Sequence, residues 1–283
     1  MRRALVALCA ALLAISALAV RAQPAAPVDG FSGAAAAYLV VADGAPLWAA
    51  AADRPLPPAS LTKLMTAILV AETTPPDAVV TVSARAARTG GARMGLAAGT
   101  RIRVSELLAG LLLRSGNDAC VALAERVDGS EARFVERMNA RAGALGLAET
   151  RFTNACGFDA PGHRSSARDL AALAQRVLAV PALARLVALG RYTAHAVDGR
   201  AYPLTSTNVL MGLVPGLAGV KTGYTDGAGH CLIGYAERDG HRVLVVLLGA
   251  KDRWWDAVAM IEQAFGRVAT APPPPDQPAA PRA

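Results

Sequence analysis

The sequence contains few of the residues that build metal sites and disulfide frameworks. It has 4 cysteines and 4 histidines among 283 residues, with no Cys-x-x-Cys pair and no histidines at metal-ligand spacing. Cys9 lies in an apolar run at the N-terminus, so an odd number of widely spaced cysteines remains: Cys120, Cys156 and Cys231. We therefore expect no metal or other cofactor, and buried or incidental thiols at these positions. One disulfide with a leftover thiol is the alternative in an oxidising compartment.

The sequence also lacks a cluster of lysine and arginine residues. The formal net charge is +7, but three basic residues, Arg2, Arg3 and Arg21, precede Gln23, and no acidic residue does. The rest of the chain carries a surplus of only four positive charges. This pattern gives no local support for nucleic-acid binding, so we expect no nucleic-acid partner.

Residues 1–22 have the layout of a secretory signal peptide. Arg2 and Arg3 give a basic start, an apolar run of about 17 residues follows, and small or tolerated residues occupy the cleavage positions before Gln23. The run is at the low limit for spanning a bilayer, which makes a membrane anchor the less favoured alternative. We expect secretion across the inner membrane into the periplasm.

Strand patterns occur at both ends of the remaining chain, and helix patterns lie between them. The expected strands are a hairpin with an Asp43-Gly44 turn over residues 37–50, and runs at 219–222, 230–236 and 242–248. The expected helices start near Ser60, at the N-caps Ser105, Ser130 and Ser166, at Asn117 and at Asp252. This order predicts an α+β fold, with an antiparallel sheet flanked by helices and a helical insertion subdomain.

The expected domain organisation is simple. Residues 23–35 are rich in Pro, Gly and Ala and are expected to form a flexible lead. The about 260 residues after the apolar run are enough for one large domain or two interlocked ones, and residues 36–268 are expected to form the catalytic domain. Residues 269–283 form a Pro-rich tail that is expected to be disordered.

A first motif with chemical potential is Ser60-Leu61-Thr62-Lys63, where a Pro-rich loop enters a helix. A serine at a helix start exposes its hydroxyl, and the backbone amides of the first turn are unpaired. Lys63, three residues later, lies on the same helix face as Ser60. A lysine in a dry pocket near other cations can lose its proton and act as a base. Taken alone, the motif is weak, and a capped helix with a solvated lysine is the default interpretation.

A second motif is Ser115-Gly116-Asn117, which falls between two apolar helices. The Ser115 hydroxyl can pass a proton, and the Asn117 amide can both donate to and accept from a peptide group. The alternative is an ordinary turn between helices.

A third motif is Lys221-Thr222-Gly223 on a short strand that ends with Tyr224. Lys221 supplies positive charge, Thr222 supplies a hydroxyl, and Gly223 lets a backbone or ligand approach closely. The alternative is an edge strand with an outward-facing charge.

Together, in this order, the three motifs match the Ser-x-x-Lys, Ser-Asp-Asn and Lys-Thr-Gly set of penicillin-recognising serine enzymes. The chain resembles the low-molecular-weight penicillin-binding proteins, specifically the serine-type D-Ala-D-Ala carboxypeptidases, from about Ala37 to Phe265. The segments 57–66, 112–119 and 220–226 carry the resemblance, with Gly116 where the motif has Asp. The resemblance implies a fold of the penicillin-binding protein and β-lactamase type.

The resemblance also implies a role for each residue. Ser60 attacks the carbonyl between two D-alanines while Lys63 takes its proton, and the backbone amides of Ser60 and Tyr224 form the oxyanion hole. Ser115 returns a proton to the departing D-alanine, and water hydrolyses the acyl-enzyme. The implied substrate-binding residues are Asn117, Lys221, Thr222, Gly223, Tyr224 and Arg253. For Arg253, whose guanidinium suits a carboxylate, a surface arginine is the alternative.

The implied substrate is a peptidoglycan pentapeptide or a cross-linked muropeptide, and β-lactam antibiotics are the implied inhibitors. The main alternative activity is a D,D-endopeptidase that cleaves cross-links by the same chemistry. A non-catalytic envelope-binding protein is less favoured because every named side chain is present. A class A β-lactamase would need a Glu-x-x-Leu-Asn loop that the sequence lacks. The tail after Phe265 has no apolar helical stripe, so no C-terminal membrane anchor is expected.

Overall fold

The computed structural model describes residues 30–269. The expected signal peptide, most of the expected lead and all but the first residue of the expected tail lie outside the described residues.

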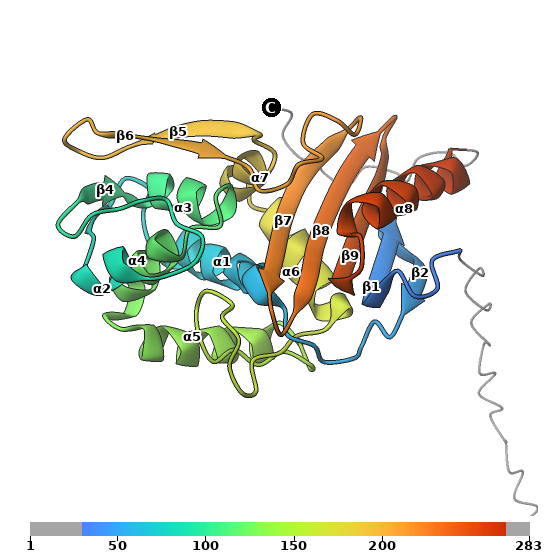
Figure 1. The fold of residues 1–283 in the computed structure, drawn as a ribbon, viewed down its shortest axis with the longest axis horizontal. Helices are drawn as coiled ribbons and strands as arrows, with labels where there is room; N and C mark the ends of the chain where they lie inside the picture. Colours follow the sequence, from blue (N-terminus) through green and yellow to red (C-terminus); the bar gives the residue numbers. More distant parts are fainter. Residues whose placement is uncertain (1–29, 270–283) are drawn as a thin grey trace, which may run out of the picture.

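The fold is organised around a five-stranded antiparallel sheet. Across the sheet the strands are β2 (Ala45–Ala50), β1 (Ala35–Ala42), β9 (His241–Ala250), β8 (Gly229–Arg238) and β7 (Leu217–Thr225). Figure 1 shows β7 at the edge of the sheet that faces the helical part of the molecule. The strands from both ends of the chain therefore meet in one sheet, with β1 paired to both β2 and β9.

Both faces of the sheet are covered by apolar cores, and successive side chains of β1 belong to these two cores in turn. Leu39 and Val41 belong to the larger core, shared with the helical region, whereas Tyr38 and Val40 belong to a smaller core beneath helix α8 (Arg253–Val268). Successive side chains of a strand point to opposite faces, so β1 contributes to both cores in turn. Asp252 caps α8 by accepting hydrogen bonds from the amides of the first turn.

The helical region surrounds α1 (Lys63–Thr73), which contacts four other helices. Every residue from Lys63 to Val70 is buried, as expected for a helix enclosed on all sides. The four are α3 (Val104–Leu112), α4 (Asn117–Asp128), α5 (Glu131–Ala144) and α6 (Ala167–Leu178). The remaining elements are α2 (Ala84–Arg88), α7 (Pro181–Val187), and the small sheets β3 (Val79–Thr81) with β4 (Arg101–Arg103) and β5 (Arg191–His195) with β6 (Ala201–Thr205).

The structure confirms the expected fold class and corrects one helix start. Ser130 and Ser166 act as N-caps, accepting hydrogen bonds from the backbone amides of Arg133 and Asp169. Ser105, in contrast, lies inside α3. The amides of Val104 and Ser105 donate to the carbonyl oxygens of Ala78 and Pro76, which satisfy the start of α3 without a serine cap.

Within residues 30–269, no single helix is both long enough and apolar enough to cross a membrane. The helices α6 and α7 meet that length and composition criterion only as a pair, with a bend of 109° between them.

Candidate active site

The turn that carries Ser60 has an uncommon backbone conformation. Ala59–Thr62 forms the 3-10 turn η1 directly before α1, and Ala59 has a φ of 48°. Gly157 packs so closely on this turn that a Cβ added to it would lie 1.9 Å from the Ala59 carbonyl oxygen. Non-glycine residues at positive φ are uncommon and cluster at functional sites. The turn places the half-buried Ser60 directly before a helix whose first eight residues, Lys63 to Val70, are all buried.

Lys63 is the immediate partner of Ser60. Its Nζ donates hydrogen bonds to Ser60 Oγ at 2.9 Å and to the Cys156 carbonyl oxygen at 2.6 Å, and the residue is 0 % exposed. Burial lowers the pKa of Lys63 well below its usual range, the charge of Lys221 lowers it further, and Asp118 opposes both. Such a lysine can be neutral where an exposed one is charged, so it can accept the proton of the Ser60 hydroxyl.

The motif of Ser115 and Asn117 turns the chain from α3 into α4. Both residues are buried, and Ser115 has a φ of 59°. The Asn117 Nδ2 donates a hydrogen bond to the Gly90 carbonyl oxygen at 2.8 Å. Among the side-chain hydrogen bonds of residues 30–269, Ser115 has none to Lys63 or Lys221. The expected proton transfer through Ser115 stays a prediction.

Strand β7 passes directly beside the Ser60 turn. A Cβ added to Gly223 would lie 3.0 Å from the Ala59 Cβ and 3.2 Å from the Ser60 nitrogen, so only a glycine leaves this approach unstrained. Lys221 is 1 % exposed and its Nζ donates to the Thr222 carbonyl oxygen at 2.8 Å. Burial, together with the charge of Arg253, lowers the pKa of Lys221 to about 7.

The rim of β7 combines a hydroxyl pair with an exposed aromatic ring. The hydroxyls of Thr222 and Thr207 are 2.6 Å apart. Tyr224 is 55 % exposed, and its ring lies 4.9 Å from the His230 ring. Of these residues of β7, Gly223 lies beside Ser60, with the buried Thr222 before it and the exposed Tyr224 ring after it.

Arg253 reaches the same strand from the start of α8. Its Nη1 donates to the Gly223 carbonyl oxygen at 2.7 Å, and its guanidinium lies 4.4 Å from the centre of the Trp254 ring. Burial lowers the pKa of Arg253. Arg253 is thus a half-buried cation near Lys221 and Gly223, and its expected role in binding a carboxylate stays a prediction.

A pocket of about 370 Å³ is lined in part by Ala59, next to Ser60. Its lining includes Pro57, Ala59, Gly157, Asp159, Pro161 and Gly227. Asp159 connects its walls, because it accepts hydrogen bonds from the Thr225 hydroxyl at 2.7 Å and the Gly227 amide at 2.9 Å.

This geometry agrees with a comparison against protein-family models. The model for D-alanyl-D-alanine carboxypeptidases matches residues 23–252. The chain belongs to this family. The match covers all three motifs and every named residue except Arg253, which follows directly after its end.

Individual family members agree in sequence. The D-alanyl-D-alanine carboxypeptidase DacF of Bacillus subtilis is 37% identical over 227 residues, which are 77% of this chain and 58% of DacF. DacC of Escherichia coli is 37% identical over 214 residues, which are 71% of this chain and 52% of DacC. The chain thus spans only about half the length of these two relatives.

Solved structures agree in fold. The DD-transpeptidase from Streptomyces has a TM-score of 0.77 and 30% identity, covering 82% of this chain and 97% of that protein. The carboxypeptidase DacD of Francisella tularensis has a TM-score of 0.76 and 27% identity, covering 88% of this chain and 72% of that protein.

Several residues outside the three sequence motifs stabilise the geometry of the site. Asp118 is 0 % exposed, and its carboxylate accepts hydrogen bonds from four backbone amides, those of Met94, Gly95, Leu96 and Ala119. It therefore orders the loop whose Gly90 carbonyl holds Asn117. The only sequence signal was its place directly after the second motif.

His163 is a second residue that the motifs omit. Its Nδ1 accepts a hydrogen bond from the Thr153 amide at 3.0 Å, so Nε2 carries the proton that it donates to Thr62 Oγ1 at 2.8 Å. Burial lowers the pKa of His163 to about 4. The neutral ring thus fastens the Ser60 turn to the loop of residues 153–163.

The expectation of incidental thiols is wrong for two of the three cysteines. Cys120 and Cys156 form a disulfide with Cα atoms 5.9 Å apart, because the fold brings α4 against the loop after Phe152. Cys231 is a free buried thiol, and burial raises its pKa to about 11. The less favoured alternative, one disulfide and one leftover thiol, is the arrangement observed.

Proposed function

We propose that this chain is a serine D-Ala-D-Ala carboxypeptidase that removes the terminal D-alanine from peptidoglycan stem peptides. The observation that supports this most strongly is the 2.9 Å hydrogen bond between the buried amine of Lys63 and Ser60 Oγ. A buried amine with a lowered pKa is what a serine nucleophile needs as its base.

In the proposed reaction the Ser60 oxygen bonds to the carbonyl carbon between the two D-alanines, and its proton moves to Lys63. The backbone amides of Ser60 and Tyr224 stabilise the negative charge that develops on the carbonyl oxygen. The bond to the departing D-alanine breaks as Ser115 supplies a proton to its nitrogen. Lys63 then passes its proton to Ser115, which restores both groups. Water adds its oxygen to the acyl carbon, the bond to Ser60 Oγ breaks, and a proton of the water passes to Ser60, so that the shortened peptide leaves and the free hydroxyl is restored.

The proposed binding site for the terminal carboxylate is the group of Lys221, Thr222 and Arg253. Lys221 and Arg253 are cations in a partly dry environment, where they attract a carboxylate more strongly than in water. A bound carboxylate favours the charged form of Lys221 and raises its pKa from about 7. Asn117 is proposed to hold the peptide amide, as its oxygen makes no hydrogen bond among the described residues.

Digestion of purified muropeptides, with mass analysis of the products, tests the proposal. We expect the enzyme to release D-alanine from a pentapeptide stem and a Ser60→Ala variant to release none. Cleavage of cross-linked dimers without release of terminal D-alanine would instead establish the D,D-endopeptidase activity. Cleavage of neither substrate would contradict a peptidase and favour an envelope-binding protein. β-Lactam antibiotics are proposed to acylate Ser60 in place of the peptide.

We also propose that the protein acts in the periplasm after export by the predicted signal peptide. The Cys120–Cys156 disulfide supports an oxidising compartment. Intact-mass analysis of the exported protein should show removal of about 22 residues. A mass that includes Met1 would contradict cleavage.

A further inference from the structure

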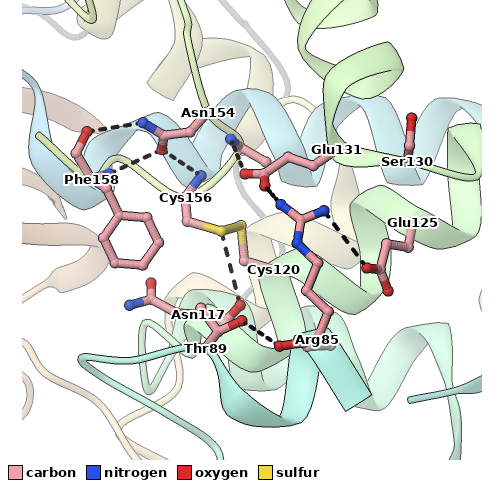
Figure 2. A network of polar contacts seen from close by, with 12 residues as sticks. Arg85, Thr89, Asn117, Cys120, Glu125, Ser130, Glu131, Asn154, Cys156 and Phe158 are labelled. Atoms are coloured by element: carbon pink, nitrogen blue, oxygen red, sulfur yellow. Dashed lines mark hydrogen bonds and ion pairs between the residues drawn. A yellow bond between two sulfur atoms is a disulfide. The ribbon is translucent and has the colours of Figure 1, made fainter. Parts of the chain in front are cut away.

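The loop of residues 154–158 lies across three helices beside the active site (Figure 2). The Thr66 hydroxyl of α1 donates to the Ala155 carbonyl oxygen at 2.7 Å, and the Ala155 amide donates to Glu131 Oε1 of α5 at 3.1 Å. Asn154 Oδ1 accepts hydrogen bonds from the amides of the last three residues of the loop. The loop therefore has a defined shape and a defined position.

The third helix holds the loop by a covalent bond. Cys120 lies one turn after Asn117 on α4, and its disulfide to Cys156 closes a separation of 36 residues. Both cysteines are buried. Figure 2 shows the disulfide between the helix that begins with Asn117 and the loop that ends with Phe158. The second motif and this loop are thus joined at one point.

One of the two disulfide cysteines, Cys156, also binds the proposed base, Lys63, through its backbone carbonyl. The Cys156 carbonyl oxygen accepts the 2.6 Å hydrogen bond from Lys63 Nζ, and Gly157, the next residue, contacts the backbone of Ala59. Cys156 therefore carries the cross-link and also binds the Lys63 amine through its carbonyl oxygen. The next residue, Gly157, contacts the Ser60 turn.

We infer that Cys156 is a positioning residue for Lys63, and that the Cys120–Cys156 disulfide keeps its carbonyl oxygen on the lysine amine. The inference rests on the proposed role of Lys63 as the base for Ser60. With the cross-link in place, the loop both directs Nζ toward Ser60 and excludes water from it. Without the cross-link, the loop is held only by its hydrogen bonds, which water can replace, and by the packing of Ala155 and residue 156 in the core.

The effect on Lys63 can be separated from the other charges around it. Lys221 of β7, Asp118 of α4 and His163 of the following loop face Lys63, and none of the three is replaced in a variant that changes only the cysteines. Burial is the main cause of the low pKa of Lys63, so water entering at the loop raises that pKa. Less of the amine is then neutral at a given pH, and the acylation rate falls.

The test measures the rate constant for acylation by a labelled penicillin between pH 5 and pH 10, for the wild type and a Cys120→Ala/Cys156→Ala variant. We expect the acid limb of the profile to move to higher pH by about one unit. We expect acylation at pH 7 to fall by about tenfold or more, because small misplacements of a catalytic group are costly. The melting temperature should fall by about 5–15 °C.

The matched control is Val40→Ala in the smaller core beneath α8, which should lower the melting temperature by a similar amount and leave the profile unchanged. If the double cysteine variant also shows a wild-type profile, the disulfide serves stability alone and the inference is wrong. If that variant does not fold, reduction of the folded wild type by a phosphine provides the same comparison, with the phosphine oxidised as two thiols form. A wild type that penicillin does not acylate contradicts the proposed function itself, and with it the inference.

Discussion

The charge of Lys221 on β7 lowers the pKa of Lys63 on α1, so the two buried lysines of the site are electrostatically coupled. Lys221 has a pKa of about 7 itself, because it is buried and lies near Arg253. The site therefore has two amines with different roles, a base beside Ser60 and a cation beside the proposed carboxylate site.

Replacing Lys221 with methionine removes a like charge and should raise the pKa of Lys63. The acid limb of the acylation profile should then move to higher pH, because the neutral amine forms only above that pKa. The measurement is the penicillin acylation constant against pH. Lys251→Met, at an exposed position, is the control and should leave the limb unchanged. An unmoved limb in the Lys221 variant would argue against the coupling.

Gly157→Ala should disrupt the Ser60 turn, since the new Cβ would meet the Ala59 carbonyl oxygen at 1.9 Å. We expect acylation to fall by about 100-fold or more, as for a displaced nucleophile. Gly162→Ala is the matched control, because Gly162 also has a positive φ but open space around its Cβ position. Both variants bear a backbone cost of about 1–2 kcal/mol, so only Gly157→Ala should lose activity beyond its loss of stability. Equal activity of the two would refute the close contact.

Asp118→Asn should lower the free energy of unfolding by about 2–4 kcal/mol, because an amide nitrogen would face backbone amides that the carboxylate now accepts. Chemical denaturation measures this change. Asp53→Asn, whose carboxylate is exposed and pairs with Arg168, should change it by less than about 1 kcal/mol. Similar losses for both variants would contradict the role given to Asp118.

His163 predicts a specific pH dependence of stability. Its pKa is about 4 in the folded protein and about 6.5 in the unfolded chain, so the unfolded state binds more protons between these values. Stability is therefore complete above pH 6.5 and falls toward pH 4, by about 3 kcal/mol from this residue. In a His163→Gln variant the unfolding free energy should vary less over this window. If the unfolding free energy depends on pH equally in both proteins, groups other than His163 cause that dependence.

Arg253→Gln should lower kcat/KM for a peptide with a free terminal carboxylate by about 10–100-fold, through loss of a charge-assisted interaction. The same peptide with a terminal amide should be affected little. Arg238→Gln is a control, because Arg238 pairs with Glu262 on α8 rather than with β7. If the preference for the carboxylate is unchanged, Arg253 does not bind it.

The sequence predicted the fold class, the hairpin at Asp43-Gly44 and the three motifs, because each depends on local periodicity or on residues a few positions apart. It did not predict β5 and β6, because each alternates over only five residues and β6 contains a proline, which argues against a strand. The carbonyl of Cys156 could not be predicted, because a backbone oxygen is present in every residue and only the fold selects one.

The remaining site residues were missed for the same reason of distance. His163 and Thr62 are 101 positions apart in the chain, and no spacing rule connects them. The pairing of Cys120 with Cys156 needed the packing of α4 on the loop, and the contact of Arg253, a residue that the sequence did suggest, with Gly223 needed α8 to begin beside β7. The residue types in the motifs indicated a serine nucleophile with a lysine base. Only the fold shows which other buried groups contact these residues.

The most direct measurement is mass analysis of the peptide that carries Ser60 after the protein reacts with a labelled penicillin. We expect one label per molecule, attached at Ser60. The label should be absent in Ser60→Ala, and labelling should be strongly slowed in Lys63→Ala. Label on another residue, or undiminished labelling of Ser60→Ala, would contradict the role of Ser60 as the nucleophile.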